Sequence, residues 1–332
     1  MNKTEFDTLF DNFNNIKIGV VGDAMLDTYW WGRVERISPE APVPIVTVSK
    51  REQRIGGAAN VALNAKSLGC NVHMLTIVGN DGDGNQLTNL LNKSEINTDY
   101  LIKSDLRITT NKIRIISKNQ QMMRLDAEMT NAIDAQEENN LLLQLTKYIQ
   151  TEKPHIVILE DYNKGVLTEK TIKDAIRICH SNNVLVAVDP KRKNFFCYKN
   201  ADIFKPNLQE AKDALNIVQD ELNEDFMDFI HASLYEKLQH KASFITLSEK
   251  GVYYNDGNES KIIPTHVRTI ADVSGAGDTV IAVAAIVYAA TQNFQLMAEI
   301  ANIAGGLVCE EVGTVAIDKN KLLAEAKSLL IK

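Results

Sequence analysis

The chain has 332 residues, of which 45% are hydrophobic and 24% charged, an ordinary balance for a globular protein with one large or two modest α/β domains. Asp and Glu number 43 and Lys and Arg 36, which gives a net charge of −7 at pH 7. An acidic chain has no overall attraction for nucleic acid or an anionic membrane, so any phosphate chemistry must depend on local groups.

The four cysteines and six histidines form no CxxC, HxxxH or HxH motif, so none of the common zinc or redox motifs is present. Scattered single thiols are typical of a reducing compartment. The first residues lack the basic and apolar regions of a signal peptide, and no apolar run reaches the length of a membrane span. We therefore expect a cytoplasmic protein with no membrane or nucleic-acid partner.

Short apolar runs alternate with helical patterns along most of the chain. Helices are expected over 3–14, 58–68, 83–93, 135–151, 168–181, 207–215, 225–239, 279–290, 295–311 and 319–331. Strands are expected over 17–23, 72–79, 156–161, 184–189 and 244–248. This alternation predicts an α/β fold in three layers, with a mostly parallel central sheet covered by helices on both faces.

Two segments depart from that rhythm. Residues 42–48 are flanked by proline and alternate in polarity, and residues 109–117 followed by 122–126 also alternate. Alternation indicates strands with one solvated face. We expect a small β-sheet lid, contributed by about 40–50 and 107–126, on a single domain that spans 1–332. Its apolar face makes a homodimer through the lid plausible.

Polar groups follow most of the expected core strands, as at Asp23, Glu160-Asp161, Asp189-Pro190-Lys191, Lys205-Pro206-Asn207 and Ser248-Glu249. Polar residues also follow buried strands simply because the chain returns to the surface. However, ligands of open α/β sheets bind outside the carboxyl ends of the strands. Several such ends carrying acids and lysines therefore favour a site at this edge.

Two glycine clusters each precede a helical pattern. Gly275-Ala276-Gly277-Asp278 could present backbone N–H groups to an anion, with Asp278 beside them as a base for an attacking hydroxyl. The alternative is that Asp278 only caps a buried helix. Gly56-Gly57-Ala58-Ala59-Asn60 would let a ligand approach the backbone, or would form only a tight turn with close helix packing.

These clusters carry a resemblance to a known family. Residues 56–62 with Gly69 and Gly79 resemble the first signature of the ribokinase-like, or PfkB, family of carbohydrate kinases, and residues 272–278 resemble its second. Asn207 and Glu210 are similar to the Asn-x-x-Glu element of that family. The resemblance covers essentially the whole chain, and it implies a ribokinase-like fold and ATP-dependent sugar phosphorylation.

Further segments resemble one branch of this family. They are residues 22–27, residues 36–44, and Asn119-Gln120-Gln121 with Arg124-Leu125-Asp126. That branch phosphorylates D-glycero-β-D-manno-heptose 7-phosphate at the anomeric hydroxyl, on the way to ADP-heptose for lipopolysaccharide core. Another PfkB kinase, for fructose 1-phosphate or ribose, and a catalytically silent sugar- or nucleotide-binding protein remain the alternatives.

The resemblance also implies roles for individual residues. Asp278 would take the proton from the sugar hydroxyl, while the amides of Gly275, Ala276 and Gly277 stabilise the transferred phosphoryl group. Asn207 and Glu210 would organise Mg²⁺ and the ATP phosphates, with water between Glu210 and the metal. Sugar hydroxyls would bind Asp27, Gly56, Gly57 and Asn60, and the nucleotide would lie against Ser248, Glu249, Gly251 and Asn302.

The phosphate already on the substrate needs a cation. Lys112, Arg114, Arg124 and Lys191 are the candidates, and Asp161 at a strand end is a further expected substrate contact. A basic residue of the lid could equally lie on a solvated face, whereas the position of Lys191 at a strand end favours Lys191 slightly. The sequence leaves open which one binds the phosphate, and whether a monovalent cation binds near 312–314. Val283 and Ser248-Glu249 depart from the usual family pattern.

Overall fold

The computed structural model describes residues 1–118, 120–219, 221–266 and 268–331, so Asn119 of the motif quoted above lies outside the described residues. Within these residues, one sheet has the strand order β14-β13-β12-β11-β10-β9-β1-β4. Its strands are β1 (Lys17–Gly22), β4 (Asn71–Leu75), β9 (Ile156–Glu160), β10 (Leu185–Asp189), β11 (Ile203–Phe204), β12 (Ala242–Thr246), β13 (Val252–Asn255) and β14 (Ser260–Ile263). Neighbours from β4 to β12 pair in parallel, whereas β13 and β14 are antiparallel.

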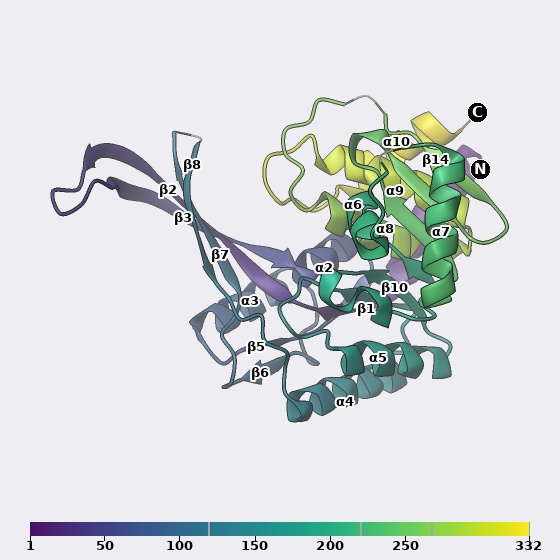
Figure 1. Cartoon of the computed structure of the whole chain (residues 1–332), viewed down its shortest axis with the longest axis horizontal. Helices are drawn as coiled ribbons and strands as arrows, with labels where there is room; N and C mark the ends of the chain where they lie inside the picture. The colour runs from purple at the N-terminus through teal and green to yellow at the C-terminus, as the bar shows by residue number, and fades with distance from the viewer. Residues whose placement is uncertain (119, 220, 267, 332) are drawn as a thin grey trace.

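Helices cover both faces of this sheet, as Figure 1 shows. One core contains side chains of α1 (Lys3–Asn12), α2 (Ala58–Ser67), α3 (Gly82–Lys93), α8 (Ala276–Thr291), α9 (Phe294–Val308) and α10 (Lys319–Leu330). The other contains side chains of α4 (Ala135–Glu152), α5 (Glu169–Ser181), α6 (Leu208–Leu215) and α7 (Glu224–Leu238). Successive strand residues enter opposite cores, as Val20 and Val21 do. The expected three-layer α/β fold is confirmed.

Helix α8 carries apolar side chains on all sides, and all sides of the helix are buried. Every residue from Asp278 to Tyr288 is buried, and each Val or Ile there contributes about 1.5–3 kcal/mol through burial. This packing fixes the N-terminus of α8 against the body of the sheet. The expected helices all form, with ends displaced by no more than three residues.

The register brings the polar strand ends to one edge. Gly22 of β1 pairs with Glu160 of β9, which in turn pairs with Asp189 of β10. Lys205 follows β11, and its backbone N–H donates to Val188 of β10. The acids and lysines that the sequence placed after separate strands therefore lie side by side.

A second sheet, with strand order β3-β2-β7-β8, projects from the body of the molecule (Figure 1). It consists of β2 (Ala24–Ile37), β3 (Pro44–Gly57), β7 (Asn111–Ser117) and β8 (Gln120–Ala127). It is larger than the expected segments 40–50 and 107–126, because the sequence did not predict β2. Burial falls steadily along β2 as it leaves the core, so its residues show no constant alternation.

Smaller corrections concern the sheet edges. The single strand expected over 72–79 is divided, because β5 (Ile77–Gly79) leaves the main sheet and pairs with β6 (Ile102–Ser104). Ser248 belongs to a 3-10 turn, Ser248–Lys250, instead of a strand. Further 3-10 turns cover Phe13–Asn15 and Arg192–Cys197.

Among the described residues, no helix combines the length and the apolar character that crossing a membrane requires.

Candidate functional site

The N-terminus of α8 provides a cluster of backbone donors. Its cap residue Gly275 has φ 79°, a left-handed conformation that favours glycine, and no side chain caps the helix there. A Cβ at Gly275 would also lie 2.9 Å from Nδ2 of Asn60. The Ala276 N–H donates to the Val273 carbonyl at 3.3 Å, so the amides of Gly275 and Gly277 are better placed than Ala276 for an incoming anion.

Asp278 lies in the first turn of α8 and is 5% exposed. Its Oδ1 accepts the phenol O–H of Tyr162 at 2.6 Å, and its Oδ2 accepts Nδ2 of Asn60 at 2.7 Å. Burial raises the pKa of Asp278 to about 6, while these two donors oppose the shift. A carboxylate that titrates near neutrality beside a helix N-terminus can act as a general base.

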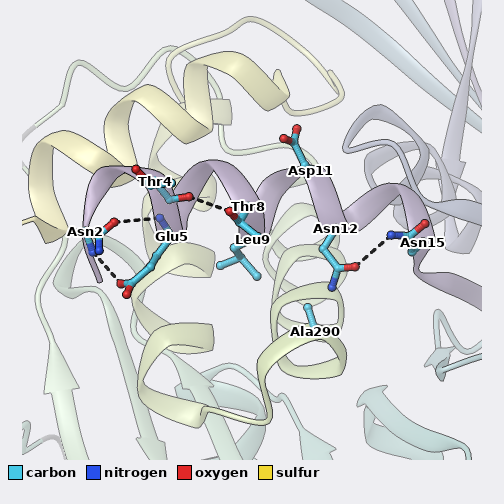
Figure 2. Close-up of a pocket in the computed structure, with 9 residues that line it drawn as sticks. All are labelled: Asn2, Thr4, Glu5, Thr8, Leu9, Asp11, Asn12, Asn15 and Ala290. Atoms are coloured by element: carbon cyan, nitrogen blue, oxygen red, sulfur yellow. Dashed lines mark hydrogen bonds between the residues drawn. The ribbon is translucent and has the colours of Figure 1, made fainter.

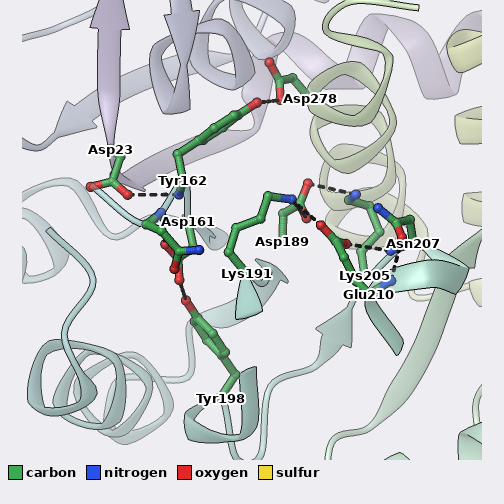
Figure 3. Close-up of polar contacts among 11 residues, drawn as sticks. Asp23, Asp161, Tyr162, Asp189, Lys191, Tyr198, Lys205, Asn207, Glu210 and Asp278 are labelled. Carbon is green, nitrogen blue, oxygen red and sulfur yellow. Dashed lines mark hydrogen bonds and ion pairs between the residues drawn. The ribbon is translucent and has the colours of Figure 1, made fainter. Parts of the chain in front are cut away.

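The loop after β9 carries Tyr162 and is held by the buried carboxylate of Asp23. Asp23 accepts backbone N–H groups from Tyr162, Lys164 and Val166, at 2.9, 3.0 and 3.0 Å. Burial raises the pKa of Asp23, and these donors oppose the rise. Figure 3 shows Tyr162 extending from this loop to Asp278.

Beside Asp278, the strand ends form a cluster of acids and lysines (Figure 3). Lys205 is buried and pairs with Asp189 at 2.8 Å, and Lys191 pairs with Glu210 at 2.7 Å and with Asp189 at 3.5 Å. A Cβ built on Gly277 would lie 3.9 Å from Nζ of Lys205, so this ammonium is adjacent to the α8 amides. Burial, with Asp189 and Asp278 nearby, raises the pKa of Glu160 well above its usual range.

Asn207 and Glu210 form a capping box on α6. Oδ1 of Asn207 accepts the Glu210 N–H at 2.8 Å, and Oε2 of Glu210 accepts the Asn207 N–H at 2.9 Å. Oε1 of Glu210 is the partner of Lys191. These residues therefore lie beside the cluster of acids and lysines, and the capping box accounts for their spacing. The described residues include no group of three or more His, Cys, Asp or Glu placed to bind a metal ion.

The first glycine cluster lies across from α8. Gly57 caps α2 with φ 60°, and a Cβ there would lie 2.5 Å from the Asp23 carbonyl. A Cβ on Gly56 would lie 2.4 Å from Oδ2 of Asp27, and Oδ1 of Asp27 pairs with Arg114 at 2.5 Å. Asp27, Gly56 and Gly57 thus converge, whereas the amide of Asn60 points to Asp278.

The candidate cations of the second sheet differ in their partners. Arg124 is exposed and pairs with Asp126 on its own strand at 2.9 Å. Lys112 is partly buried, 5.6 Å from the centre of the Tyr162 ring, and has no ion-pair partner among the described residues. Burial lowers the pKa of Lys112, although Asp27 opposes this. Lys164 pairs with Glu128 at 2.7 Å.

The residues expected at the nucleotide converge on the turn after β14. Gly251 has φ 104°, and a Cβ on it would lie 2.0 Å from the Ile263 carbonyl. The Gly251 N–H donates to Ser248, which begins the turn that contains Glu249. The side-chain amide of Asn302 donates to the Pro264 carbonyl at 2.9 Å, so it supports the turn that follows β14.

Asp161 is buried, and its carboxylate points toward Tyr198. Its carboxylate accepts the Tyr198 phenol at 2.8 Å and the Asn163 N–H at 2.7 Å, which Figure 3 shows in part. Burial raises its pKa to about 6. Both carboxylate oxygens therefore already accept hydrogen bonds within the protein, and the role of Asp161 in substrate binding stays a prediction.

The loop 312–314, the expected place of a monovalent cation, contacts the second signature and strand β3. The Gly313 N–H donates to Asp272 at 2.9 Å, and Arg54 of β3 reaches the Thr314 carbonyl at 3.5 Å. Cation binding there stays a prediction.

A surface depression elsewhere carries none of these groups. It has a volume of about 670 Å³ and runs along α1 (Figure 2). It is lined by Asn2, Thr4, Glu5, Thr8, Leu9, Asp11, Asn12, Asn15 and Ala290. Several of these side chains serve the helix itself, as Asn2 and Glu5 do in a capping box. We therefore assign the chemistry to the edge of the main sheet.

Tyr162 and Lys205 belong to the site, although the sequence alone indicates no role for either side chain. Lys205 stands at a strand end, and Tyr162 directly follows the strand-end acids Glu160 and Asp161. That adjacency was the available signal. A tyrosine after a buried strand is common, however, and only the folded loop brings its phenol to Asp278.

Residues 15–321 match the family model described as pfkB family carbohydrate kinase. The bifunctional protein HldE of Aliarcobacter butzleri (strain RM4018) is 39% identical over 310 residues, which are 93% of this chain and 64% of that protein. The bifunctional protein HldE of Geobacter sulfurreducens is 34% identical over 325 residues, 97% of this chain and 65% of that protein. The chain spans less than two thirds of the length of these curated relatives.

Solved structures share the fold. Phosphofructokinase-2 from Escherichia coli, in complex with potassium, aligns with a TM-score of 0.77 at 16% identity, covering 93% of this chain and 99% of that one. Ribokinase from Arabidopsis thaliana, complexed with ribose and ATP, aligns with a TM-score of 0.72 at 17% identity, covering 93% and 98%. The expected ribokinase-like architecture is confirmed by these similarities.

Proposed function

Because the chain belongs to the pfkB family of carbohydrate kinases, we propose that it phosphorylates D-glycero-β-D-manno-heptose 7-phosphate with ATP, at the anomeric hydroxyl. The observation that carries the kinase chemistry is the oriented carboxylate of Asp278 beside the open N-terminus of α8. The choice of acceptor rests on the branch motifs of residues 22–27, 36–44 and 120–126. The product is the 1,7-bisphosphate, an intermediate of ADP-heptose synthesis for lipopolysaccharide.

The proposed step is a single in-line displacement. Asp278 accepts the proton of the anomeric hydroxyl as its oxygen bonds to the γ-phosphorus, and the bond from that phosphorus to the bridging oxygen of ATP breaks, which releases ADP. The amides of Gly275 and Gly277, with the ammonium of Lys205 beside them, would stabilise the negative charge that accumulates on the transferred group. The nucleotide would lie along the turn that contains Ser248, Glu249 and Gly251.

Mg²⁺ is proposed as the partner of the ATP phosphates, where it would neutralise their charge. Glu210, with Asn207 beside it, is the carboxylate that suits this role through water. Lys191 occupies one oxygen of Glu210 at 2.7 Å, and the Asn207 N–H occupies the other. Metal binding would therefore depend mainly on the nucleotide and water.

We assign the substrate's own phosphate to Lys112. Its ammonium has no ion-pair partner among the described residues, and it lies beside the ring of Tyr162, whose phenol donates to Asp278. A half-buried cation with no carboxylate in direct contact is under-compensated, so an anionic ligand would bind it favourably. Lys191 and Arg124 already have carboxylate partners, which makes them weaker candidates.

We also propose that the second sheet is a lid and that it pairs with a second copy of this chain in the cytoplasm. The cross-strand register places Trp30, Ile113, Ile115, Met123 and Leu125 on one face, opposite the face of Asp27, Lys112 and Arg114. Met123 is 53% exposed and Leu125 44%. A contiguous apolar face of this kind is suited to pairing with its own copy.

The acceptor is tested with ADP release from ATP in the presence of single sugars. We expect turnover with heptose 7-phosphate to exceed that with ribose, fructose 1-phosphate or fructose 6-phosphate by at least about 100-fold in kcat/KM. Turnover confined to a pentose or a ketose phosphate would refute the heptose proposal but leave the kinase intact. Binding of sugar and ATP without turnover of any acceptor would identify a silent binding protein.

A further inference from the structure

Asp278 is surrounded by charges that act in opposite directions on its protonation. Asp189 disfavours its ionised form, whereas Lys205 favours it. Burial also disfavours ionisation, and the net result is a pKa of about 6. A base in such surroundings depends on its hydrogen-bond donors to remain ionised and in one orientation.

Two donors supply this support, one to each oxygen. Asn60 donates to Oδ2 from α2, and Tyr162 donates to Oδ1 from the loop after β9. Burial and the neighbouring Asp278 raise the pKa of Tyr162 well above its usual range, so its phenol remains a proton donor throughout the range in which Asp278 titrates. The proton of the attacking hydroxyl therefore goes to Asp278, and Tyr162 keeps its own.

Both the backbone and the ring of Tyr162 are held by neighbouring groups. Three backbone N–H groups of its loop, including its own, bind the carboxylate of Asp23. The ammonium groups of Lys112 and Lys191 lie 5.6 and 5.8 Å from the centre of its ring. These contacts restrict the ring and direct the phenol to Oδ1.

We propose that Tyr162 is a positioning residue of the kinase reaction, whose phenol holds the carboxylate of Asp278 ionised and fixes its plane beside the α8 N-terminus. This inference rests on the proposed function, in which Asp278 is the base. It goes beyond that function by assigning Tyr162 as the hydrogen-bond donor to Oδ1 of Asp278.

The test compares Tyr162→Phe with Tyr253→Phe. Tyr253 is a matched control because its phenol also donates to a carboxylate at 2.6 Å, that of Asp228, which lies on α7. Asp278 is followed directly in the ligand-free protein through its side-chain carboxyl carbon, with [4-¹³C]aspartate labelling and assignment by Asp278→Asn. In parallel, kcat/KM for heptose 7-phosphate is measured against pH.

In Tyr162→Phe we expect the Asp278 titration to move upward by about one pH unit. A shift of that size lowers the ionised fraction at about pH 6 some fivefold while changing it little at about pH 8, so kcat/KM should fall about fivefold more at the lower pH. Tyr253→Phe should change neither curve. 3-Fluorotyrosine at position 162, a stronger donor, should move the titration downward and guards against a folding defect in Tyr162→Phe.

The proposal is overturned if the Asp278 titration moves by less than about 0.3 pH unit in Tyr162→Phe, or moves equally in Tyr253→Phe. The titration needs no substrate, so it separates this inference from the proposed function. A shifted titration in a protein that phosphorylates no sugar would support the role of Tyr162 toward Asp278 and refute the kinase proposal instead.

Discussion

Asn60 donates its side-chain amide to Oδ2 of Asp278 across 2.7 Å, although the two residues are 218 positions apart in the chain. The bond joins the glycine cluster at the start of α2 to the one at the start of α8. The resemblance to known kinases implied that Asn60 binds sugar hydroxyls. Here its amide is committed to the proposed base, so the two glycine clusters form one site.

Asp278→Asn removes the proposed base with little change in shape. We expect kcat to fall by about 10²–10⁴-fold, while the affinities for ATP and sugar phosphate change by less than about threefold. Steady-state kinetics and equilibrium titration measure the two effects. Asp318→Asn is the control, because Asp318 only caps α10 by accepting the Lys321 N–H at 2.8 Å. Equal kinetic effects in both variants would return Asp278 to a capping role.

The buried acids should make stability depend on pH. Burial raises the pKa of Asp278 and of Asp161 from 3.8 to about 6, so the folded state binds their protons more tightly than the unfolded state does. Their favourable contribution is complete below pH 3.8, is lost progressively up to about pH 6, and is absent above it.

Each acid should therefore cost on the order of 2–3 kcal/mol of unfolding free energy at neutral pH, relative to acid conditions. The measurement is urea unfolding of the wild type, Asp161→Asn and Asp278→Asn between about pH 4.5 and pH 8. The free energy of unfolding should decline less steeply with pH in each variant than in the wild type. Parallel curves would show that the two carboxyls have ordinary pKa values.

Lys112→Met should affect one substrate only. If Lys112 binds the phosphate of the sugar, KM for heptose 7-phosphate should rise about 10–100-fold, with KM for ATP unchanged within about twofold. Lys50→Met is the control on the same sheet, since Lys50 already pairs with Glu52 at 2.7 Å. An unchanged KM in Lys112→Met together with a raised KM in Arg124→Ala would move the phosphate to Arg124.

Asp23→Asn should destabilise the fold through the Tyr162 loop. An amide oxygen cannot replace both carboxylate oxygens as acceptors for the three N–H groups at 2.9–3.0 Å, so buried donors lose partners. We expect a loss of about 2–4 kcal/mol in urea unfolding. Asp256→Asn is the control, because Asp256 accepts two N–H groups in an exposed turn and should cost less than about 1 kcal/mol.

Charges on the apolar face of the second sheet should dissociate the proposed dimer. Met123→Glu combined with Leu125→Glu places two carboxylates on that face, where burial in a dimer would be unfavourable. Sedimentation should change from dimer to monomer, whereas Leu143→Glu on α4, where Leu143 is 64% exposed, should leave the dimer intact. A wild-type protein that sediments as a monomer, or a doubly charged variant that remains dimeric, would contradict the pairing.

The helices and core strands could be predicted because their signals are local. Each depends on a run of about ten residues, as the uniformly apolar sequence of α8 does, and both glycine clusters stand at the start of helices as expected. The family could also be identified, because its two signatures are contiguous motifs in the right order. These parts of the prediction needed no knowledge of contacts between distant residues.

The remaining features depend on such contacts. Strand β2 has no constant face, because it passes from the core to solvent within 14 residues. The phenol of Tyr162 reaches Asp278 only because Asp23 holds the intervening loop. The pairing of Lys191 with Glu210 follows from the order of the strands, which a sequence pattern does not specify.

The insertion of α8 into a core that includes α2, β9 and β10 has a consequence for synthesis. A nascent chain that has not yet reached Ala276 leaves the apolar side chains of Ile158 on β9 and Ala187 on β10, two strands that α8 contacts, without that helix. We expect such chains to need protection from aggregation on the ribosome. Ribosome-bound chains truncated before α8 should be cleaved rapidly by protease, and chains that include α9 should resist. The enzyme would then gain its base and its resistance to aggregation at the same point of translation.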